Sequence, residues 1–216
     1  MSQKYSLVLG SQSPRRKELL GLLKIPYEIV VLPTTEEGPE GDPVKFVEHV
    51  ASRKCDVIWA QLKKRPNFST VYFPLLITAD TIVVLQGKIL GKPDDREDAR
   101  RILSQLSGNE HSVYTSVMLQ TLDMENKKIR QRCFTVQSRV VFSEISRSIM
   151  DHYLDTGESL DKAGAYGIQG PSLTFVKEVY GSYANVVGFP LVEFVAELKQ
   201  FVLADDQTLW SKFHGG

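Results

Sequence analysis

The first half of the chain alternates short apolar runs with longer segments whose apolar residues recur at helical spacing. Each short run predicts a β-strand, and strands are expected at residues 5–9, 27–32, 75–79 with a continuation to 85, and 88–90. The apolar stripes predict helices that begin at Pro14 and Pro43, and a third over about residues 95–106. Ser13 and Asp42 precede the two prolines and suit the N-cap position.

Longer strands dominate the second half of the chain. Residues 111–122 and 129–142 flank a polar turn near 123–127 and predict an antiparallel pair. The remaining elements are expected as a helix at 146–156, a glycine-rich loop at 161–170, a strand at 173–179 and a helix at 190–203. Because early alternation of strands and helices gives way to antiparallel pairing, the pattern predicts an α/β fold with a mixed sheet.

The length and composition indicate one sizeable core. The chain has 216 residues, of which 42% are hydrophobic, and we expect one domain of two lobes over residues 1–204 with a C-terminal tail over 205–216. The 26 lysines and arginines balance 26 acidic residues. This balance argues against a nucleic-acid-binding protein, since such proteins normally carry a basic excess, but it leaves room for a local anion site.

Cysteine use and the N-terminal segment bear on location. Cys55 and Cys133 provide neither a framework of disulfides nor metal-ligand spacing, which suggests a reduced, intracellular protein. The first apolar run, residues 5–9, is too short for a signal peptide or a membrane span. A cytoplasmic protein without a nucleic-acid or membrane partner is therefore expected.

Basic residues gather at the start of the first predicted helix, where Arg15, Arg16 and Lys17 follow Pro14. The helix dipole disfavours cations at this end, so the cluster favours a compensating anion. Free backbone N–H groups there suit a phosphate, the hydroxyl of Ser11 adds a donor, and arginine binds phosphate through two parallel hydrogen bonds. The same residues also fit a capped helix with solvated basic side chains, and the pattern alone leaves both interpretations open.

Two more charged residues stand among apolar neighbours. Lys54 lies in register with the apolar stripe of the second helix, three residues after Ala51, where it can extend to solvent or reach an anion site at the sheet edge. Asp80 follows the apolar run 75–79, which places a carboxylate at a strand's end, where ligands of α/β sheets gather. It can hold Mg²⁺ or accept a proton from water, or it can serve only as a turn residue.

Several familiar motifs are absent from the sequence. It contains no G-x-x-x-x-G-K-[ST] phosphate loop, no G-x-G-x-x-G and no G-x-S-x-G nucleophile turn. The four histidines, at positions 49, 111, 152 and 214, have no metal-ligand spacing. The commonest ATPase, dinucleotide-binding and serine hydrolase classes are therefore unsupported.

Five ordered stretches resemble the Maf family of nucleoside triphosphate pyrophosphatases. They read LGSQSPRRKELL at 9–20, ADTIVV at 79–84, ILGKP at 89–93 with the following residues 99–108, DKAGAYGIQG at 161–170, and GSYANVVG at 181–188. The resemblance runs in order from about residue 5 to residue 203. It implies an elongated α/β fold with a mixed sheet, helices on its flanks, and a cleft between two lobes.

The resemblance also implies an activity and a site. Such proteins cleave a nucleoside triphosphate to the monophosphate and pyrophosphate, with a divalent metal ion, here expected as Mg²⁺ or Mn²⁺. The matching cleft residues are Ser11, Arg15 and Arg16 in the phosphate-contacting loop, Lys54 and Lys92 as basic lining residues, and Asp80 as the catalytic carboxylate. Asp80 and Glu37 are the expected metal ligands. Glu36 is adjacent to Glu37, and Thr34 and Thr35 occupy positions where the family often has acidic residues.

The family divides by substrate, and three positions indicate the branch. Arg15, Thr81 and Gln169 match the branch that acts on dTTP and UTP, whereas a branch acting on 7-methyl-GTP differs there. A glutamine amide both donates and accepts hydrogen bonds, which suits a pyrimidine edge. A homodimer is expected by resemblance only. Two alternatives stay open, namely a nucleotide-binding regulator of growth or division without enzymatic activity, and a pyrophosphatase of the related inosine-triphosphate group.

Overall fold

A mixed seven-stranded sheet forms the centre of the computed structural model, which describes residues 5–65, 68, 73–123 and 128–202. The strands are β1 (Tyr5–Leu9), β2 (Tyr27–Ile29), β3 (Phe73–Leu85), β4 (Lys88–Leu90), β5 (Glu110–Leu122), β6 (Ile129–Phe142) and β7 (Val176–Tyr180). Their order is β2-β1-β3-β5-β6-β7, with β4 paired to β3. β1 is parallel to β2 and β3, and the other pairs are antiparallel. The predicted α/β fold with a mixed sheet is confirmed.

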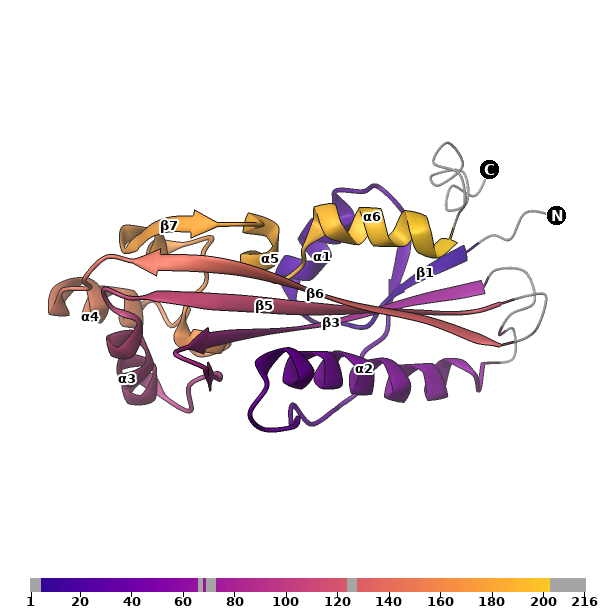
Figure 1. Cartoon of the computed structure of the whole chain (residues 1–216), viewed down its shortest axis with the longest axis horizontal. Coiled ribbons are helices and arrows are strands. Elements are labelled where there is room, and N and C mark those ends of the chain that lie inside the picture. The colour runs from indigo at the N-terminus through magenta and orange to yellow at the C-terminus, as the bar shows by residue number, and fades with distance from the viewer. Residues whose placement is uncertain (1–4, 66–67, 69–72, 124–127, 203–216) are drawn as a thin grey trace.

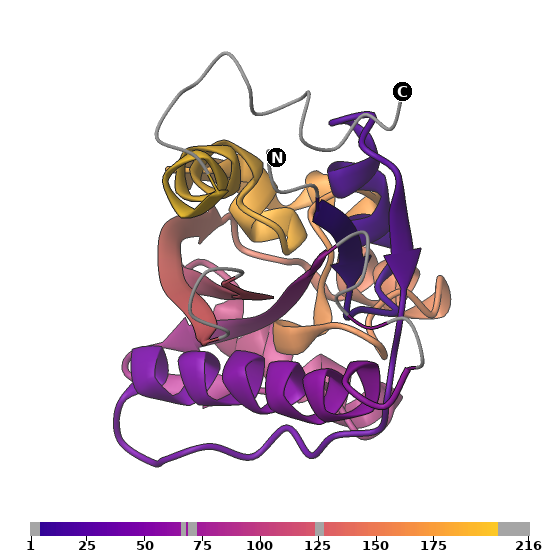
Figure 2. The same ribbon diagram turned by 90° about the vertical axis from the view of Figure 1, so that its right-hand side faces the viewer.

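Helices cover both faces of this sheet. They are α1 (Pro14–Gly21), α2 (Pro43–Leu62), α3 (Arg96–Leu106), α4 (Arg147–Asp155), α5 (Tyr183–Val187) and α6 (Leu191–Val202), with short 3-10 turns η1 (Ala163–Ala165) and η2 (Pro171–Thr174). Figure 1 shows an elongated molecule in which β3, β5 and β6 run along the long axis, with α3 and α4 at one end. Seen end-on in Figure 2, α2 lies on one side of the sheet, and α1 and α6 lie on the other.

The caps expected from the sequence begin the helices where predicted. The Ser13 hydroxyl accepts a hydrogen bond from the backbone N–H of Arg16, and the Asp42 carboxylate accepts from those of Val44 and Lys45. Each cap satisfies donors that the first helical turn leaves without a partner. Both helices therefore start at the following proline. The start of α1 at Pro14 sets the direction of the basic side chains that follow it.

β3 changes partners partway along its length, and this places Asp80 in the middle of a strand rather than at a strand's end. Its first half pairs with β1 as far as Ile77, and β4 pairs with it only from Val83 onward. β5 pairs with β3 from Leu76 to Val84, with Asp80 opposite Ser116. The strand that ends near Asp80 is β1, whose last residue, Leu9, lies opposite Ile77 of β3. The gap between β1 and β4 opens the sheet beside Asp80.

Two large hydrophobic clusters lie on either side of this gap. One packs α1 and α6 against β1 and the first half of β3, up to Ala79. The other packs α3 and α4 against the far ends of the long strands and includes Val83 and Val113. Between them, Asp80 and Thr81 of β3 pair with Ser116 and Thr115 of β5. A belt of polar residues thus lies between the two cores.

Some element boundaries differ from those predicted. β2 ends at Ile29 rather than at residue 32, whereas α2 starts at Pro43 as predicted and runs to Leu62. β7 begins at Val176 rather than at residue 173, because Pro171 fixes a 3-10 turn before it. The five-residue helix α5 was not expected. The predicted tail at 205–216 and most of the turn near 123–127 lie outside the described residues. In the described part of the chain, no helix has the length and apolar character needed to span a membrane.

Candidate functional site

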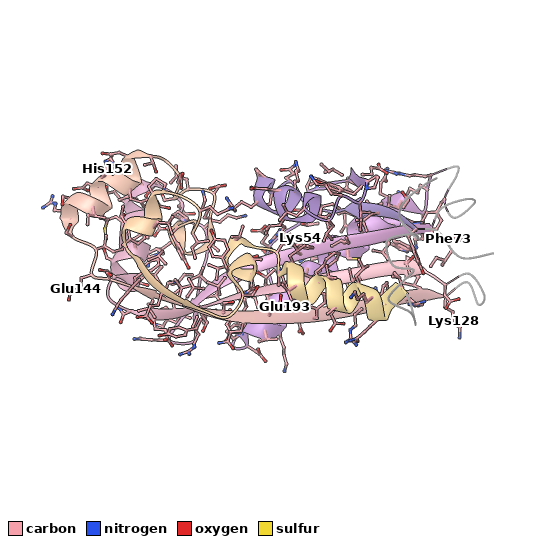
Figure 3. The ribbon with its side chains drawn as sticks, turned by 90° about the horizontal axis from the view of Figure 1, so that it is seen from above. Lys54, Phe73, Lys128, Glu144, His152 and Glu193 are labelled. Atoms are coloured by element: carbon pink, nitrogen blue, oxygen red, sulfur yellow. The ribbon has the colours of Figure 1, made fainter. Side chains whose placement is uncertain are left out.

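A cavity of about 680 Å³ lies beside the polar belt, where both halves of the molecule contribute walls. Its lining comes from seven parts of the chain, namely residues 10–16, the loop before α2 with one face of that helix, residues 80–83, residues 89–92, Val113 of β5, and the segments 161–168 and 186–188. In Figure 3, Lys54 lies near the middle of the molecule, between the ends marked by Phe73 and Glu144. The cavity is therefore central and draws on segments distant in sequence.

Ser11 lies at the start of α1 with its oxygen already used as an acceptor. Its Oγ accepts hydrogen bonds from the backbone N–H of Ser13 at 3.2 Å and from Nη1 of Arg16 at 3.4 Å. A hydroxyl has one proton and two lone pairs. Because both lone pairs are engaged, the group that Ser11 can present to the cavity is its proton, which suits a phosphate oxygen.

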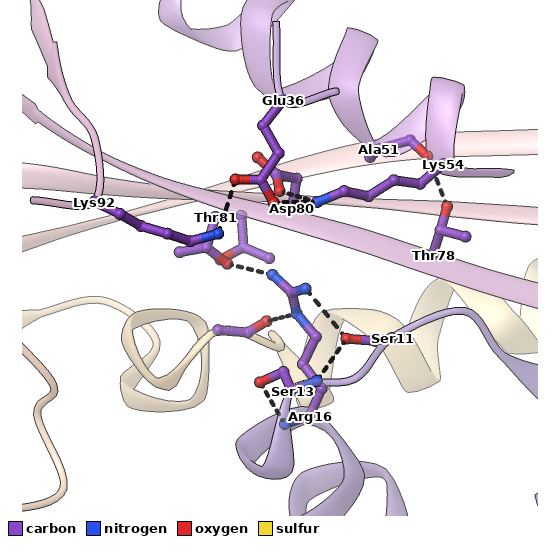
Figure 4. A network of polar contacts seen from close by, with 12 residues as sticks. Ser11, Ser13, Arg16, Glu36, Ala51, Lys54, Thr78, Asp80, Thr81 and Lys92 are labelled. Atoms are coloured by element: carbon purple, nitrogen blue, oxygen red, sulfur yellow. Dashed lines mark hydrogen bonds and ion pairs between the residues drawn. The ribbon is translucent and has the colours of Figure 1, made fainter. Parts of the chain in front are cut away.

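Arg16 ties three elements together across the cavity (Figure 4). Its Nε donates to the carbonyl of Gly188 at 2.9 Å, and its Nη2 donates to Oγ1 of Thr81 at 3.0 Å. Burial lowers the pKa of Arg16, an effect that the charge of Asp80 opposes, and arginine keeps its charge under such shifts. Arg16 therefore joins α1, β3 and the end of α5, and its remaining N–H groups are available to an anion.

Arg15 has a looser environment than Arg16. Its nearest acidic partner is Asp161, with Nη1 and Oδ2 separated by 3.7 Å, and its side chain is 27% exposed. Asp161 belongs to the loop after α4, and its neighbour Lys162 donates to Oδ1 of Asp161 at 2.6 Å. Arg15 and Lys162 both line the cavity. The mouth of the cavity thus carries two cations and one exposed carboxylate.

Opposite the arginines, two lysines and two carboxylates form a chain of ion pairs. Nζ of Lys54 lies 2.6 Å from Oδ1 of Asp80 and 3.0 Å from Oε1 of Glu36, and Nζ of Lys92 lies 2.8 Å from Oε2 of Glu36 (Figure 4). The side chains of Lys54 and Asp80 are only 15% and 10% exposed. Lys54 therefore reaches into the site, and the alternative in which it extends to solvent does not apply.

The two lysines hold Glu36 as a carboxylate. Burial alone would raise the pKa of Glu36, but the hydrogen bond from Lys92 and the charge and hydrogen bond of Lys54 together outweigh it and lower the pKa to about 2. The charges of the cluster cancel among themselves. Glu36 thus pre-positions both lysines at one wall of the cavity.

Glu36 should make the protein sensitive to acid. Since the pKa of Glu36 is lowered in the folded state, its stabilising contribution is complete above its ordinary pKa and is lost as the pH falls toward about 2. We expect the Glu36→Gln variant to lose less unfolding free energy than the parent between about pH 5 and about pH 2. Urea unfolding across this range measures the difference.

Glu37→Gln is the matched control, since Glu37 follows Glu36 in the chain and is likewise exposed, but does not line the cavity. It should keep the acid dependence of the parent. Identical pH profiles for the parent and Glu36→Gln would show that the lysines do not hold Glu36 as described.

Most of the predicted site residues meet at the cavity, and two do not. Ser11, Arg15, Arg16, Lys54, Asp80, Thr81 and Lys92 all line it, together with Thr34. Glu37 is exposed and lies outside the lining, and its neighbour Glu36 lines the cavity instead. Gln169 is also exposed and lies outside the lining, next to Ile168, which belongs to it.

Sequence reasoning assigned no role to several residues that build the site. Lys162 lies in the glycine-rich loop, next to Asp161. This pair of opposite charges is the sequence feature that could have indicated a role for Lys162. Gly188 adopts a left-handed conformation with φ of 119°, which favours glycine and aims its carbonyl at Arg16. Thr115 lies on β5 opposite Thr81, and its contribution depends on strand register.

The carboxylates of the site suit a divalent cation only in part. In the described part of the chain, no group of three or more histidine, cysteine, aspartate and glutamate side chains could hold a metal ion. Asp80 and Glu36 nevertheless both lie within 3.0 Å of a single ammonium group. Mg²⁺ is commonly held by one or two carboxylates together with water and substrate phosphates. The donor set therefore fits a cation that arrives with a phosphorylated ligand.

Comparisons with known proteins agree with the geometry. A model of the family described as Maf-like protein matches residues 6–201. The dTTP/UTP pyrophosphatase of Bacillus velezensis is 40% identical over 196 residues, which is 90% of this chain and 96% of that protein. The dTTP/UTP pyrophosphatase of Pelotomaculum thermopropionicum is 39% identical with the same coverage. That of Porphyromonas gingivalis is 42% identical over 202 residues, 92% of this chain and 96% of that protein.

Proposed function

The chain belongs to the family of Maf-like proteins, and from this premise we propose that it is a nucleoside triphosphate pyrophosphatase that hydrolyses dTTP and UTP. The products are the nucleoside monophosphate and inorganic pyrophosphate. One observation carries the proposal. A single central cavity brings the proton of Ser11, the cations Arg15, Lys54 and Lys92, and the carboxylate of Asp80 to facing walls.

The triphosphate binds between α1 and the lysine wall. The N-terminus of α1 supplies partial positive charge, and Ser11 supplies a hydroxyl proton. Arg15 leaves its long contact with Asp161 for a phosphate oxygen, a change that costs little because the contact is 3.7 Å and partly exposed. Lys92 approaches from the opposite wall. Charge stabilisation by these groups dominates, because phosphoryl transfer depends mainly on positioning and electrostatics.

Asp80 is the catalytic residue in this proposal. Lys54 binds its Oδ1 at 2.6 Å and fixes the carboxylate in the wall of the cavity. The other oxygen, Oδ2, accepts a proton from the water that attacks the α-phosphorus, and the bond from the α-phosphorus to the bridging oxygen breaks. Pyrophosphate leaves with the electron pair of that bond. The nucleoside monophosphate carries the oxygen of the water.

A divalent cation, Mg²⁺ or Mn²⁺, belongs to the proposal as a cofactor. Asp80 and Glu36 are the residues that would hold it, in place of the pair Asp80 and Glu37 expected from the sequence. When bound, the cation supplies neutralisation of the charge on the triphosphate oxygens. The homodimer and the cytoplasmic location stay predictions of the sequence.

The nucleobase preference rests on the relatives and on one side chain of the cavity. The three relatives described above are dTTP/UTP pyrophosphatases by name. Thr81, expected among the specificity positions, lines the cavity, whereas Gln169 lies outside its lining. A role for Gln169 requires the loop 161–170 to close over the substrate.

A nucleotide panel tests the proposed function. With Mg²⁺ present, we expect pyrophosphate release from dTTP and UTP, with kcat/KM on the order of tenfold or more above that for ITP and 7-methyl-GTP. Ion chromatography of the products measures this directly and shows which anhydride bond is cut. Preference for ITP would assign the chain to the inosine-triphosphate group. Tight nucleotide binding without release of pyrophosphate would instead indicate a regulator.

A further inference from the structure

A chain of hydrogen bonds runs from the cavity into the polar belt between the two cores. Nη2 of Arg16 donates to Oγ1 of Thr81 at 3.0 Å, and Oγ1 of Thr81 lies 2.9 Å from Oγ1 of Thr115. The hydroxyl of Thr115 then donates to the backbone carbonyl of Asn185 at 3.1 Å. Thr81 is the member of the chain that lines the cavity beside Arg16, as Figure 4 shows.

The end of this chain favours one direction for the protons in it, because that direction lets every contact be a hydrogen bond. A threonine hydroxyl has one proton, and that of Thr115 is used at the carbonyl of Asn185. Both contacts of Thr115 are hydrogen bonds at the same time only when Thr81 is the donor in the contact between the two threonines. Its single proton points away from the cavity, which agrees with its acceptance of a hydrogen bond from Arg16.

Burial keeps Thr115 in this orientation. Thr115 and Asn185 are both 0% exposed, so solvent offers the Thr115 proton no alternative acceptor. The side chain of Asn185 is itself held, because its Nδ2 donates to the carbonyl of Val113 at 3.1 Å and to Oγ of Ser138 at 3.0 Å. The carbonyl that receives the Thr115 proton thus belongs to a residue fixed to both β5 and β6.

We propose that Thr115 is a positioning residue of the site, which fixes the proton of Thr81 so that Thr81 presents a lone pair, and no proton, to the substrate. Thr81 then presents an acceptor to the substrate, whereas Ser11 presents its proton as a donor. The space beside the Thr81 oxygen is kept open by Gly188, where a Cβ would stand 3.5 Å from Oγ1. A substrate group that meets Thr81 must therefore be a hydrogen-bond donor.

This polarity distinguishes pyrimidine bases, and here the inference rests on the proposed function. Uracil and thymine carry an N–H donor at N3, whereas the N3 of cytosine is an acceptor. An acceptor facing an acceptor leaves both groups without a partner, which costs free energy in a buried site. The structure thus assigns Thr81 the discrimination of UTP and dTTP from CTP, and assigns Thr115 the role of enforcing it.

The Thr115→Val variant removes the hydroxyl but keeps the shape of the side chain. Thr81 can then rotate and offer its proton to the cavity, so we expect the preference for UTP over CTP in kcat/KM to fall by about tenfold. Thr115→Ser restores the hydroxyl and should restore the preference. Thr121→Val is the matched control, because Thr121 is also buried on β5 and donates to the carbonyl of Pro74 at 2.9 Å. It should lower stability without altering the preference.

Dissociation constants for UTP and CTP, measured by calorimetry without metal, give a second readout that does not require turnover. An unchanged preference in folded Thr115→Val, or equal binding of UTP and CTP by the parent, would overturn the inference. If Thr115→Val does not fold, Thr115→Ala carries the same comparison. A parent that binds UTP selectively but releases no pyrophosphate refutes the proposed function, while the binding ratios still decide the role of Thr115.

Discussion

Replacing Asp80 with asparagine is expected to lower kcat for dTTP hydrolysis by about 10²–10⁴-fold. The amide keeps the shape of the Asp80 side chain, which is 10% exposed, but it cannot accept a proton from water. It also leaves Lys54 with Glu36 as its remaining carboxylate partner. Steady-state kinetics with dTTP, together with thermal unfolding of the same preparation, separate the loss of chemistry from a loss of folded protein.

Asp161→Asn provides the matched change within the same cavity. Asp161 lines the mouth, is 66% exposed and has contacts with Arg15 and Lys162. We expect this variant to change kcat by less than about tenfold, since exposed ion pairs contribute little. If Asp80→Asn retained parental kcat, or if Asp161→Asn lost as much as Asp80→Asn, Asp80 would not be the catalytic residue.

Replacing Arg16 with lysine should affect stability and activity together. Lysine keeps the charge but cannot reproduce donations in three directions, to the Gly188 carbonyl, Thr81 and Ser11. The free energy of unfolding should fall by about 2–3 kcal/mol, which corresponds to a decrease in Tm of about 5–10 °C. Because α1 and Thr81 lose their common anchor, kcat/KM should fall by on the order of 10²-fold.

Arg15→Lys is the control, one residue away on the same helical turn. Arg15 makes one long ion pair at 3.7 Å, so its replacement should leave Tm within about 2 °C of the parent. Calorimetry of both variants measures the contrast. Equal Tm values for the two would mean that the bonds of Arg16 do not hold the site together.

The fold could be predicted because local chemistry determines it, whereas the residues of the cleft were predicted from the family resemblance. Ser13 with Pro14, and Asp42 with Pro43, fix where two helices begin whatever surrounds them. The two long strands, β5 and β6, were also predicted, since long runs of strand-forming residues flank a polar turn. Helix starts and strand lengths then leave few arrangements open.

Features that depend on strand partners were harder to predict. The polar residue after an apolar run suggested a strand's end at Asp80, but β3 runs on to Leu85, as the predicted continuation implied, and only its neighbour β1 ends. The choice between Glu36 and Glu37 depends on the path of an irregular loop, which adjacent identical residues cannot reveal. Local sequence patterns do not indicate a role for Thr115, because its contact with Thr81 follows from the register of β3 and β5.

The polar belt between the two cores has a thermodynamic consequence. Because the walls of the cavity include the start of α1, which packs in the first core through Leu20, and residues of the second core such as Val83 and Val113, local unfolding of either half destroys the binding site. A bound nucleotide therefore stabilises both halves at once, by an amount that grows with the logarithm of its concentration above Kd. Two packing units that meet along the long strands thus become one cooperative unit whenever substrate is present.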